Sequence, residues 1–290
     1  MPMSECHGHI FMDGADYRAA RERHSTAPVE TAVRANLQVL KDADIHYFRD
    51  GGDNLGVSLL ARDLAGEYSM EFATPAFAIH RRGRYGSIVG KSYESLSEYL
   101  SLLEEGQFLR GDFIKLMFSG IMRFDAACPF SCLPLEADEI HMLVSSAHSM
   151  GMPVMAHVNG ADAVLAAARA GTDSIEHGYY TDDACLEAMA KSGSIWVPTL
   201  AAVEAFLHRD GVDTAQVESV LQHQFRQVRK AVSLGIPVAS GSDAGAVGVF
   251  HGKGLLRELE LLESAGVDRA RIQRANGLLR ERFSGTQSVS

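Results

Sequence analysis

The chain has 290 residues, of which 46% are hydrophobic and 22% are charged, and this average composition excludes intrinsic disorder and a collagen-like repeat. Its 27 basic and 37 acidic residues give a net charge of −10, which repels phosphate backbones and anionic membrane surfaces. Small molecules are therefore the expected partners, with neither nucleic acid nor a membrane among them.

The apolar stretches are too short to cross a membrane. The longest strongly apolar stretch, residues 113–122, is interrupted by Lys115, whereas a spanning helix needs roughly 20 apolar residues. The opening MPMSECHGHIF lacks the basic and apolar run of a secretory signal. Four cysteines without a CxxC pair are too sparse for a disulfide framework. We predict a cytoplasmic protein with reduced thiols.

Eight short β-branched or aromatic runs alternate with segments of helical periodicity. This alternation is typical of βα units with a parallel sheet, and eight units predict a TIM-type (β/α)8 barrel, with a doubly wound open sheet as the alternative. No linker divides the chain, so we expect one barrel domain over residues 1–283 and a disordered polar tail at 284–290. The runs lie at 6–11, 45–50, 71–80, 112–119, 153–158, 173–178, 195–200 and 237–243, and helical segments between them include 136–150, 160–170, 181–192 and 214–234.

Four of these helical segments end at a glycine, where we expect the chain to turn into the left-handed conformation. Each glycine is followed, after an even number of positions, by a polar residue near the end of the next run. Because side chains along a strand alternate between faces with period two, the four polar residues are predicted to share one phase and one rim. The glycines are 151, 171, 193 and 235, and the polar residues are His157, His177, Thr199 and Asp243.

Side chains that can bind metals are concentrated at the C-terminal ends of the predicted strands, where TIM barrels place their active sites. Each one alone has a structural interpretation, as a hydrogen-bonded histidine, a snorkelling lysine or a turn-capping aspartate. Six on one rim instead predict a metal site, and imidazoles with a carboxylate suit zinc and its first-row neighbours. They are His7 and His9 on the first strand, Lys115 on the fourth, His157 on the fifth, His177 on the sixth and Asp243 on the eighth.

The spacing and chemistry of three of these residues add detail. His7 and His9 are two positions apart and so face one side of the strand, as two ligands of one ion require. A buried lysine such as Lys115 loses its proton readily. The neutral amine could then add carbon dioxide and form a carbamate whose two oxygens bridge two metal ions.

These residues, in this order, resemble the metal-dependent amidohydrolase superfamily, and most closely its prolidase-like and imidazolonepropionase-like branch. The resemblance implies that His7 and His9 bind the more buried of two divalent ions, most simply zinc, and that a carboxylated Lys115 bridges the pair. It implies that His157 and His177 bind the second ion, while Asp243 binds the first and shuttles the proton. The matching segments are HxH at 7–9, IHYFRDGGD at 45–53, FIKLM at 113–117, AHVNG at 156–160, SIEHG at 174–178 and GSDAG at 241–245.

The sequence departs from the family pattern in two ways. Members usually carry a small β-sandwich built from both termini, which this sequence does not supply, so a barrel-only protein or a shortened chain is expected. The barrel surface left bare would allow a homo-oligomer. Asn159 stands where many prolidase-like members have a second histidine, so their substrate preference does not carry over.

Candidate substrate contacts lie mainly in the basic loop HRRGRYGSIVGKSYE at 80–94. The loop is as consistent with a solvated charge run as with a clamp for a substrate carboxylate. His80 is the preferred contact because it ends a strand on the same rim, and Arg84, Tyr85 and Asn159 are the other candidates. Arg49 and Asp50, after the second strand, are expected to be structural, through a buried ion pair.

The predicted function is hydrolysis of an amide bond, in a dipeptide, an N-acyl amino acid or a cyclic amide. A hydroxide shared by two metal ions would attack the carbonyl, and Asp243, the catalytic residue, would pass the proton to the leaving nitrogen. A lactone, carbamate or phosphotriester hydrolase would use the same residues, and Lys115 disfavours a deaminase. Two non-enzymatic or metal-free alternatives remain: a catalytically silent binding barrel, and a phosphate-binding barrel, which lacks a glycine-rich cradle here.

Overall fold

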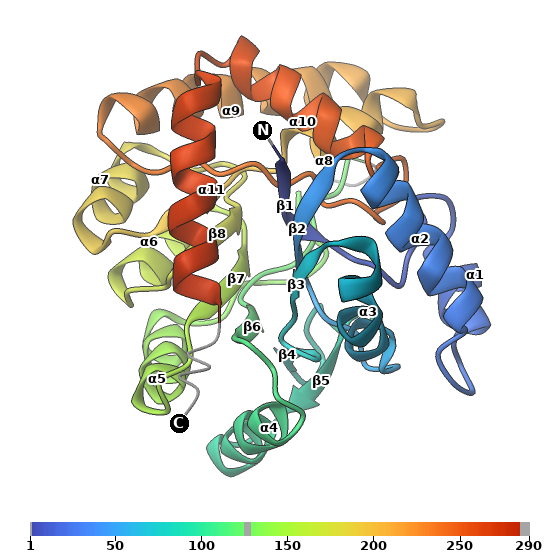
Figure 1. Ribbon diagram of the computed structural model, residues 1–290. Helices are drawn as coiled ribbons and strands as arrows, with labels where there is room; N and C mark the ends of the chain where they lie inside the picture. Colours follow the sequence, from blue (N-terminus) through green and yellow to red (C-terminus); the bar gives the residue numbers. More distant parts are fainter. Residues whose placement is uncertain (1, 125–128, 285–290) are drawn as a thin grey trace.

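Parallel strands form the inner layer and helices the outer layer of the computed structural model, which describes residues 2–124 and 129–284 (Figure 1). One sheet has the strand order β1-β2-β3, with β1 at Met3–Gly8, β2 at Ile45–Asp50 and β3 at Glu71–Ala73. The other has the order β5-β4-β6-β7-β8-β9, with β4 at Ala78–Arg81, β5 at Gly90–Tyr93, β6 at Ile114–Met117, β7 at Val154–Val158, β8 at Ser174–His177 and β9 at Ile195–Val197. Every pairing within the two sheets is parallel.

The third predicted strand, residues 71–80, joins the two sheets. It is split into β3 and β4 at Pro75, which cannot donate a ladder hydrogen bond, and at Ala76, whose φ is 68°. Because β3 pairs with β2 and β4 pairs with β6, the sheets continue into one another through this segment.

The eighth predicted strand, 237–243, lies between β9 and β1. Parallel bridges join Trp196 to Val238 on one side and Gly8 to Ala244 on the other. The segment thus lies between the last and first strands of the ring. It pairs with them through isolated bridges and does not form a continuous strand. The predicted TIM-type barrel is confirmed.

Two strand predictions need correction. The first strand ends at Gly8 rather than extending through residues 6–11, because the chain turns at His9, whose carbonyl accepts from the Met12 N–H. The following Ile10 is buried without belonging to a strand, so its hydrophobicity extended the prediction too far. Strand β5, with the sequence GKSY, lies inside the segment 80–94 that was predicted to be a loop. It has no apolar face by which the sequence would indicate a strand.

Helices cover the outside of the barrel (Figure 1). The four periodic segments are confirmed as α5, α6, α7 and α9, and the glycine after each has a positive φ of 71–80°. Short 3-10 helices lie at η1, Gly66–Tyr68, and η2, Ala205–His208. The α-helices are α1 Tyr17–Arg23, α2 Glu30–Asp42, α3 Val57–Ala65, α4 Leu96–Phe108, α5 Ala137–Ser149, α6 Ala161–Arg169, α7 Asp183–Ser192, α8 Leu200–Glu204, α9 Thr214–Ser233, α10 Lys253–Ser264 and α11 Arg269–Phe283.

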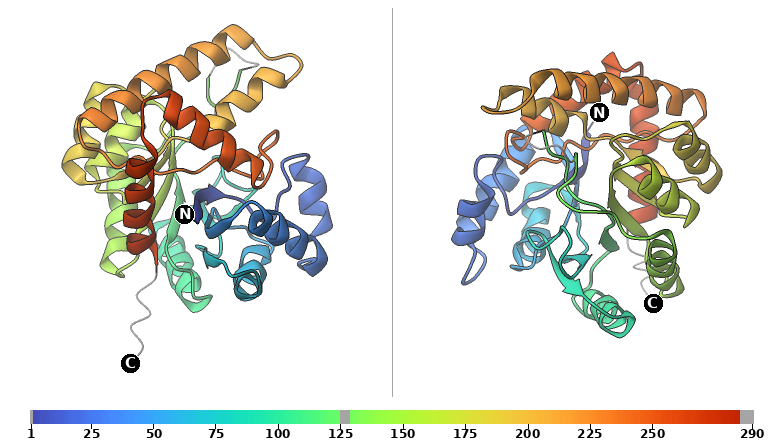
Figure 2. Two further views of the ribbon diagram at one scale, coloured as in Figure 1. Left: turned by 45° about the horizontal axis from the view of Figure 1, so that its top comes forward. Right: turned by 180° about the vertical axis from the view of Figure 1, so that it is seen from behind.

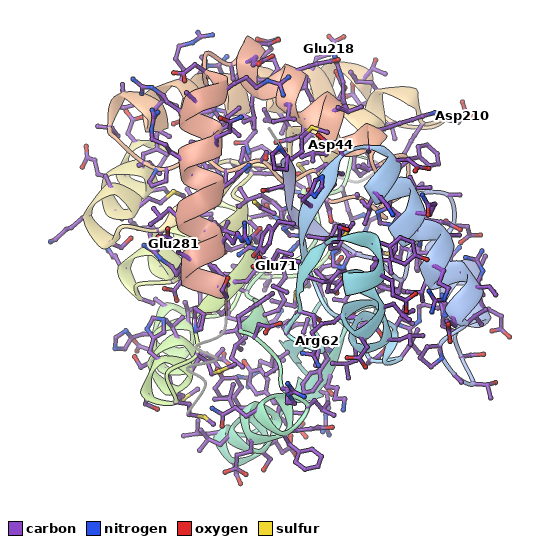
Figure 3. The ribbon with its side chains drawn as sticks, viewed as in Figure 1. Asp44, Arg62, Glu71, Asp210, Glu218 and Glu281 are labelled. Atoms are coloured by element: carbon purple, nitrogen blue, oxygen red, sulfur yellow. The ribbon has the colours of Figure 1, made fainter. Side chains whose placement is uncertain are left out.

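The last helix, α11, covers the barrel at the end where the strands begin (Figures 1 and 2). Its Leu279 and Phe283 form one buried cluster with residues at or near the starts of several strands, including Met155 and Ile195. At its surface, Arg280 pairs with Glu71 of β3, among the charged side chains on the outside of the molecule (Figure 3). The helix thereby excludes water from this end and leaves the opposite end as the place for a site.

Three cysteines, Cys6, Cys132 and Cys185, are free thiols, and Cys128 lies outside the described residues. The predicted polar tail also lies outside them, apart from Ser284, which is the C-cap of α11. Within the part of the chain that the structure describes, no helix is long and apolar enough to span a bilayer.

Candidate active site

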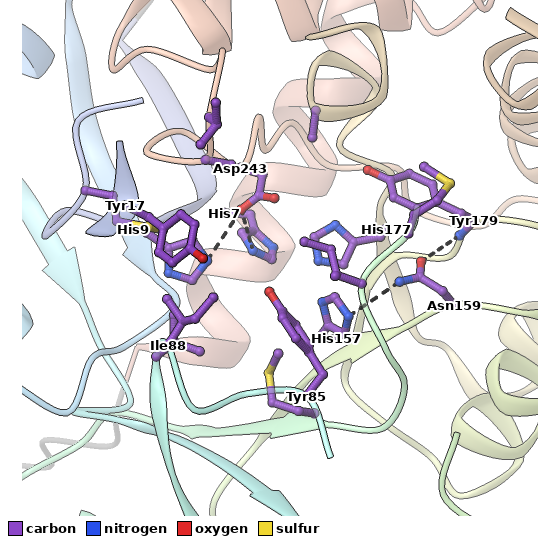
Figure 4. Close-up of a pocket in the computed structure, with 18 of the residues that line it drawn as sticks. His7, His9, Tyr17, Tyr85, Ile88, His157, Asn159, His177, Tyr179 and Asp243 are labelled. Atoms are coloured by element: carbon purple, nitrogen blue, oxygen red, sulfur yellow. Dashed lines mark hydrogen bonds and ion pairs between the residues drawn. The ribbon is translucent and has the colours of Figure 1, made fainter. Parts of the chain in front are cut away.

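The predicted metal-binding side chains come together in one cavity at the C-terminal ends of the strands (Figure 4). The cavity has a volume of about 290 Å³. Its lining includes all six of them: His7, His9, Lys115, His157, His177 and Asp243. The position of the cavity is that of the active site in TIM-barrel enzymes.

Three of these residues form a compact group where the first strand meets the eighth. The Nε2 atoms of His7 and His9 lie 3.5 Å and 3.4 Å from the same oxygen, Oδ1 of Asp243. The backbone supports this arrangement, because the Asp243 N–H donates to the carbonyl of His7 over 2.8 Å. Potential ligand atoms from the three residues all lie within 4.8 Å of one another, close enough to bind one ion.

The group depends on a glycine beside His9. A Cβ added at Gly51 would lie 2.2 Å from Cε1 of His9, which is far inside van der Waals contact. Gly51 follows β2, and its N–H donates to the carbonyl of Gly8, so it is held against the first strand. The absence of a side chain at this position leaves the space that the imidazole occupies.

The second pair of histidines lies beside the first group. The ring centroids of His157 and His177 are 4.6 Å apart, and His177 is 4.9 Å from His7. Nδ1 of His177 lies 2.8 Å from Oγ1 of Thr199, which anchors that side of the imidazole. Nε2 of His157 lies 3.3 Å from the carbonyl oxygen of Gly120.

Lys115 is buried in β6 and lines the same cavity. Its Nζ has no hydrogen-bond partner among the described residues. Burial lowers the pKa of its amine to about 8, because an apolar environment disfavours the charged form. With a pKa near 8 the amine remains mostly protonated at pH 7, but it releases its proton more readily than an ordinary lysine, whose pKa is about 10.5.

The donor set fits divalent cations. Nε2 of His7 and Nδ1 of His9 are buried and lack hydrogen-bond partners within the described chain, as does Lys115 Nζ. Burial lowers the pKa of His7 and His177 well below the ordinary range, and that of His157 to about 3. These three imidazoles are therefore neutral near pH 7 and keep a nitrogen lone pair for a metal.

Glu176 orients His7 and was not predicted as a site residue. Its Oε2 lies 2.6 Å from Nδ1 of His7, and its Oε1 accepts from Arg49 over 2.8 Å. A carboxylate on the second nitrogen fixes the orientation of a metal-binding imidazole. The sequence signal was a carboxylate inside a predicted strand, next to His177.

The predicted buried ion pair of Arg49 is confirmed, but its partner is Glu176 rather than Asp50. Both Arg49 and Glu176 are fully buried, and Nε of Arg49 also donates to the carbonyl of Cys6. Asp50 accepts instead from the backbone N–H groups of Ile10 and Gly52. It therefore shapes the turn that follows the first strand.

Of the four polar residues predicted to share one rim, His157, His177 and Asp243 line the cavity and Thr199 lies behind His177, but strand alternation explains only His157. His177, Thr199 and Asp243 have φ values of 66°, 48° and 63°, in the left-handed region that non-glycine residues rarely adopt. Each such residue costs about 1–3 kcal/mol. The neighbouring structure holds this strain at two residues that line the cavity and at Thr199, which contacts one of them, as is common at functional sites.

The proposed substrate contacts separate into two groups. Tyr85 and Asn159 line the cavity, where the Tyr85 ring lies 5.1 Å from that of His157 (Figure 4). His80 and Arg84 are not on the cavity wall. His80 is turned into its own loop, with Nδ1 3.0 Å from the carbonyl of Arg81 and its ring beneath Gly86.

The basic loop is paired with acidic neighbours, which favours the solvated-charge interpretation over a substrate clamp. Arg81 pairs with Glu139 over 2.5 Å, and Lys91 pairs with Glu105 over 2.5 Å. Arg82 likewise lies 2.8 Å from Glu94. Arg81 and Lys91 therefore hold the loop against α5 and α4, while Arg82 pairs within the loop.

Comparisons with known proteins agree with this geometry. An ochratoxinase of Aspergillus niger is 29% identical over 141 residues, which are 47% of this chain and 29% of that protein. An uncharacterised protein of Mycobacterium tuberculosis is 31% identical over 141 residues, 46% of this chain and 38% of that one. The matched segment thus spans less than two fifths of either relative.

Solved structures match over nearly the whole chain and show the fold. A Xaa-Pro dipeptidase with bound methionine has a TM-score of 0.75 and 21% identity, covering 100% of this chain and 78% of that one. The structure of the A. niger ochratoxinase has a TM-score of 0.75 and 18% identity, covering 97% of this chain and 71% of that one. A model of the amidohydrolase family matches residues 45–282. Because this match spans most of the sequence, the protein belongs to the amidohydrolase family.

Proposed function

We propose that this protein is a metal-dependent hydrolase that cleaves the amide bond of a small substrate. The observation that carries the proposal is the convergence of four imidazoles, a carboxylate and a lysine on one cavity, where three of their nitrogens are buried and have no hydrogen-bond partner among the described residues. Family membership and the names of the ochratoxinase and dipeptidase relatives support hydrolysis as the reaction class. Substrates in keeping with the cavity are dipeptides, N-acyl amino acids and cyclic amides.

Two divalent ions, most simply zinc, would be held by this donor set. His7, His9 and Asp243 would bind one ion and His157 and His177 the other, with a carboxylated Lys115 shared between them. When bound, such ions lower the pKa of water from 15.7 to about 7 and polarise a substrate carbonyl. The low pKa of Lys115 favours its reaction with carbon dioxide, which forms an N–C bond and releases one proton.

The chain itself supplies proton transfer and positioning. Asp243 faces both His7 and His9 from the cavity wall, where its carboxylate can take a proton from the attacking water. The same proton then goes to the leaving nitrogen as the C–N bond breaks, giving a carboxylic acid and an amine. General acid–base catalysis of this kind is worth about 10²–10⁴ in rate. The Tyr85 hydroxyl points into the cavity and can position the substrate (Figure 4).

The test combines metal content with activity. Elemental mass spectrometry of protein purified without chelator should find about two zinc, manganese or similar ions per chain, and the protein should hydrolyse members of an amide library. Lys115→Ala should lose bound metal and activity together. Lys191→Ala, on an exposed residue of α7, is the matched control and should lose neither.

Two results would overturn the proposal. One is a wild-type protein that takes up no metal even when metal and bicarbonate are added. The other is a Lys115→Ala variant that retains wild-type metal content and changes only in stability, as a silent binding barrel would. If the protein hydrolyses a lactone or a phosphotriester but no amide, the proposed metal site stands and the proposed substrate class is wrong.

A further inference from the structure

One cationic side chain on the cavity wall has no acidic partner in the described residues. Arg209 follows the 3-10 helix η2 and lines the cavity together with the six metal-binding candidates. Its Nη2 donates to the carbonyl of Val247, and its guanidinium carbon lies 3.9 Å from the ring centroid of Phe206. Its Nε is buried and has no hydrogen-bond partner in residues 2–124 and 129–284.

In this arrangement the Arg209 guanidinium can still form further hydrogen bonds. A guanidinium has five N–H donors in a rigid plane and stays charged in proteins. A charge removed from water is unfavourable unless it is paired, and Arg209 is half-buried, which lowers its pKa. Arg81 and Lys91, by contrast, both have carboxylate partners. An anion from a ligand would complete the pairing of Arg209.

The two contacts that Arg209 does make fix its orientation. Stacking on Phe206 sets the plane of the guanidinium, and the bond to Val247 ties it to the loop after the eighth strand. An arginine held in this way loses little conformational entropy when it binds a planar anion. A carboxylate matches its fork of donors, because two parallel hydrogen bonds can form.

Away from the metal-binding candidates, Arg209, Asn159 and three tyrosines, the wall is apolar. It includes Met12, Ile88, Met117, Ile121, Met122 and Phe206. Asp243 is the one carboxylate among the described residues that line the cavity. A ligand that fits this surface combines an apolar body with a negative group placed away from Asp243.

We propose that Arg209 binds a carboxylate of the substrate, so that the enzyme selects amides of amino acids with a free carboxylate and an apolar side chain. This inference rests on the proposed amide hydrolysis and narrows its substrate class. N-acyl amino acids and dipeptides satisfy it, whereas neutral cyclic amides and lactones do not. Arg209 acts here as a specificity residue, distinct from the groups that bind metal or move the proton.

The kinetic test uses two compounds of similar shape, N-acetyl-L-leucine and N-acetyl-L-leucinamide, in which a neutral amide replaces the carboxylate, and it follows the release of acetate from the acetyl amide that both contain. The metal-loaded wild-type enzyme should have a higher kcat/KM for N-acetyl-L-leucine, which carries the carboxylate, than for the leucinamide compound. Arg209→Gln should lower that preference by about 10- to 100-fold, the range expected for a charge-assisted hydrogen bond, and Arg209→Lys should keep part of it. Arg226→Gln, on the exposed face of α9, removes one positive charge elsewhere and should leave the preference unchanged.

A binding measurement separates this inference from the proposed function. Isothermal titration calorimetry with the same two compounds should show tighter binding of the carboxylate to wild type, and loss of that difference in Arg209→Gln. If wild type binds with this preference but hydrolyses neither compound, the carboxylate site stands and amide hydrolysis does not. If Arg209→Gln changes neither the kinetic nor the binding preference while its melting temperature matches wild type, the assignment of Arg209 is wrong.

Discussion

At the residue scale, Glu176 connects the candidate metal centre to the barrel interior. One carboxylate oxygen contacts His7 and the other contacts Arg49, whose side chain also reaches the carbonyl of Cys6. All of these groups are buried. The orientation of a metal-binding imidazole and the neutralisation of an interior charge therefore depend on one side chain.

Glu176→Ala should lower the free energy of unfolding by about 3–5 kcal/mol, because it leaves the buried Arg49 charge unpaired. It should also weaken metal binding by roughly 10- to 100-fold, since His7 loses its orienting partner. Urea denaturation and metal titration measure the two effects. Glu176→Gln keeps the shape of the side chain and should lower the free energy of unfolding less than Glu176→Ala does. Equal losses in the two variants would contradict a role for the charge.

Gly51 provides a second test at this scale. Gly51→Ala should displace the His9 imidazole and lower metal content and activity, because the added Cβ would overlap Cε1 of His9. Gly106→Ala is the control, since its Cβ would meet nothing closer than Ile114 Cδ1 at 3.9 Å. Wild-type metal content in Gly51→Ala would show that His9 can move without loss of the ion.

At the scale of single elements, the outer helices were more predictable than the inner strands. The segments that became α5, α6, α7 and α9 have apolar residues at helical spacing and end at a glycine, so local sequence defines both their type and their ends. Strand β5 depends on its ladder with β4, and the end of β1 depends on the turn at His9. Neither feature leaves an alternation of apolar residues in the local sequence.

The same distinction holds for the site. The six metal-binding candidates could be identified because their residue types are rare at strand ends and occur together. Glu176 and Arg209 could not, since the role of each comes from partners far away in the sequence, His7 for one and Val247 for the other. His80 was misplaced because its ring orientation depends on the loop that folds over it.

Helix α11 offers a test of stability at this scale. Gly277 lies exposed in the interior of this helix, and a Cβ there would meet no atom within 4 Å. Gly277→Ala should raise the free energy of unfolding by about 0.5–1 kcal/mol, because glycine loses more backbone entropy in a helix. Urea denaturation measures the gain, and metal content should stay unchanged. A decrease in stability would show that the helix is not regular at this position.

At the scale of the whole molecule, a buried acid on α10 links stability to pH. Glu258 is fully buried, with Oε2 accepting from the Ala201 N–H over 2.7 Å and Oε1 without a hydrogen-bond partner in the described residues. Burial raises its pKa from 4.5 to about 8. Between these values the folded state binds a proton that the unfolded state has released, so the contribution of Glu258 to stability falls as pH rises.

Glu258→Gln should therefore flatten the pH dependence of the unfolding free energy. Relative to the variant, the free energy of unfolding of wild type should fall by up to about 1.4 kcal/mol per pH unit as the pH rises from 5 to 8. Urea denaturation across this range measures the difference. Glu218→Gln, on an exposed side chain of α9, is the control and should run parallel to wild type (Figure 3). A constant difference between wild type and Glu258→Gln would contradict the raised pKa.

The group formed by His7, His9 and Asp243 joins the two ends of the barrel sequence. During synthesis, its two histidines leave the ribosome long before its aspartate, and they cannot form a three-ligand site until the eighth strand segment lies beside the first. The entropy of closing so long a loop must be overcome before these groups meet. The metal binding proposed for this group is thus available only to a barrel whose last strand is in place, and metal occupancy would then be a marker of completed folding.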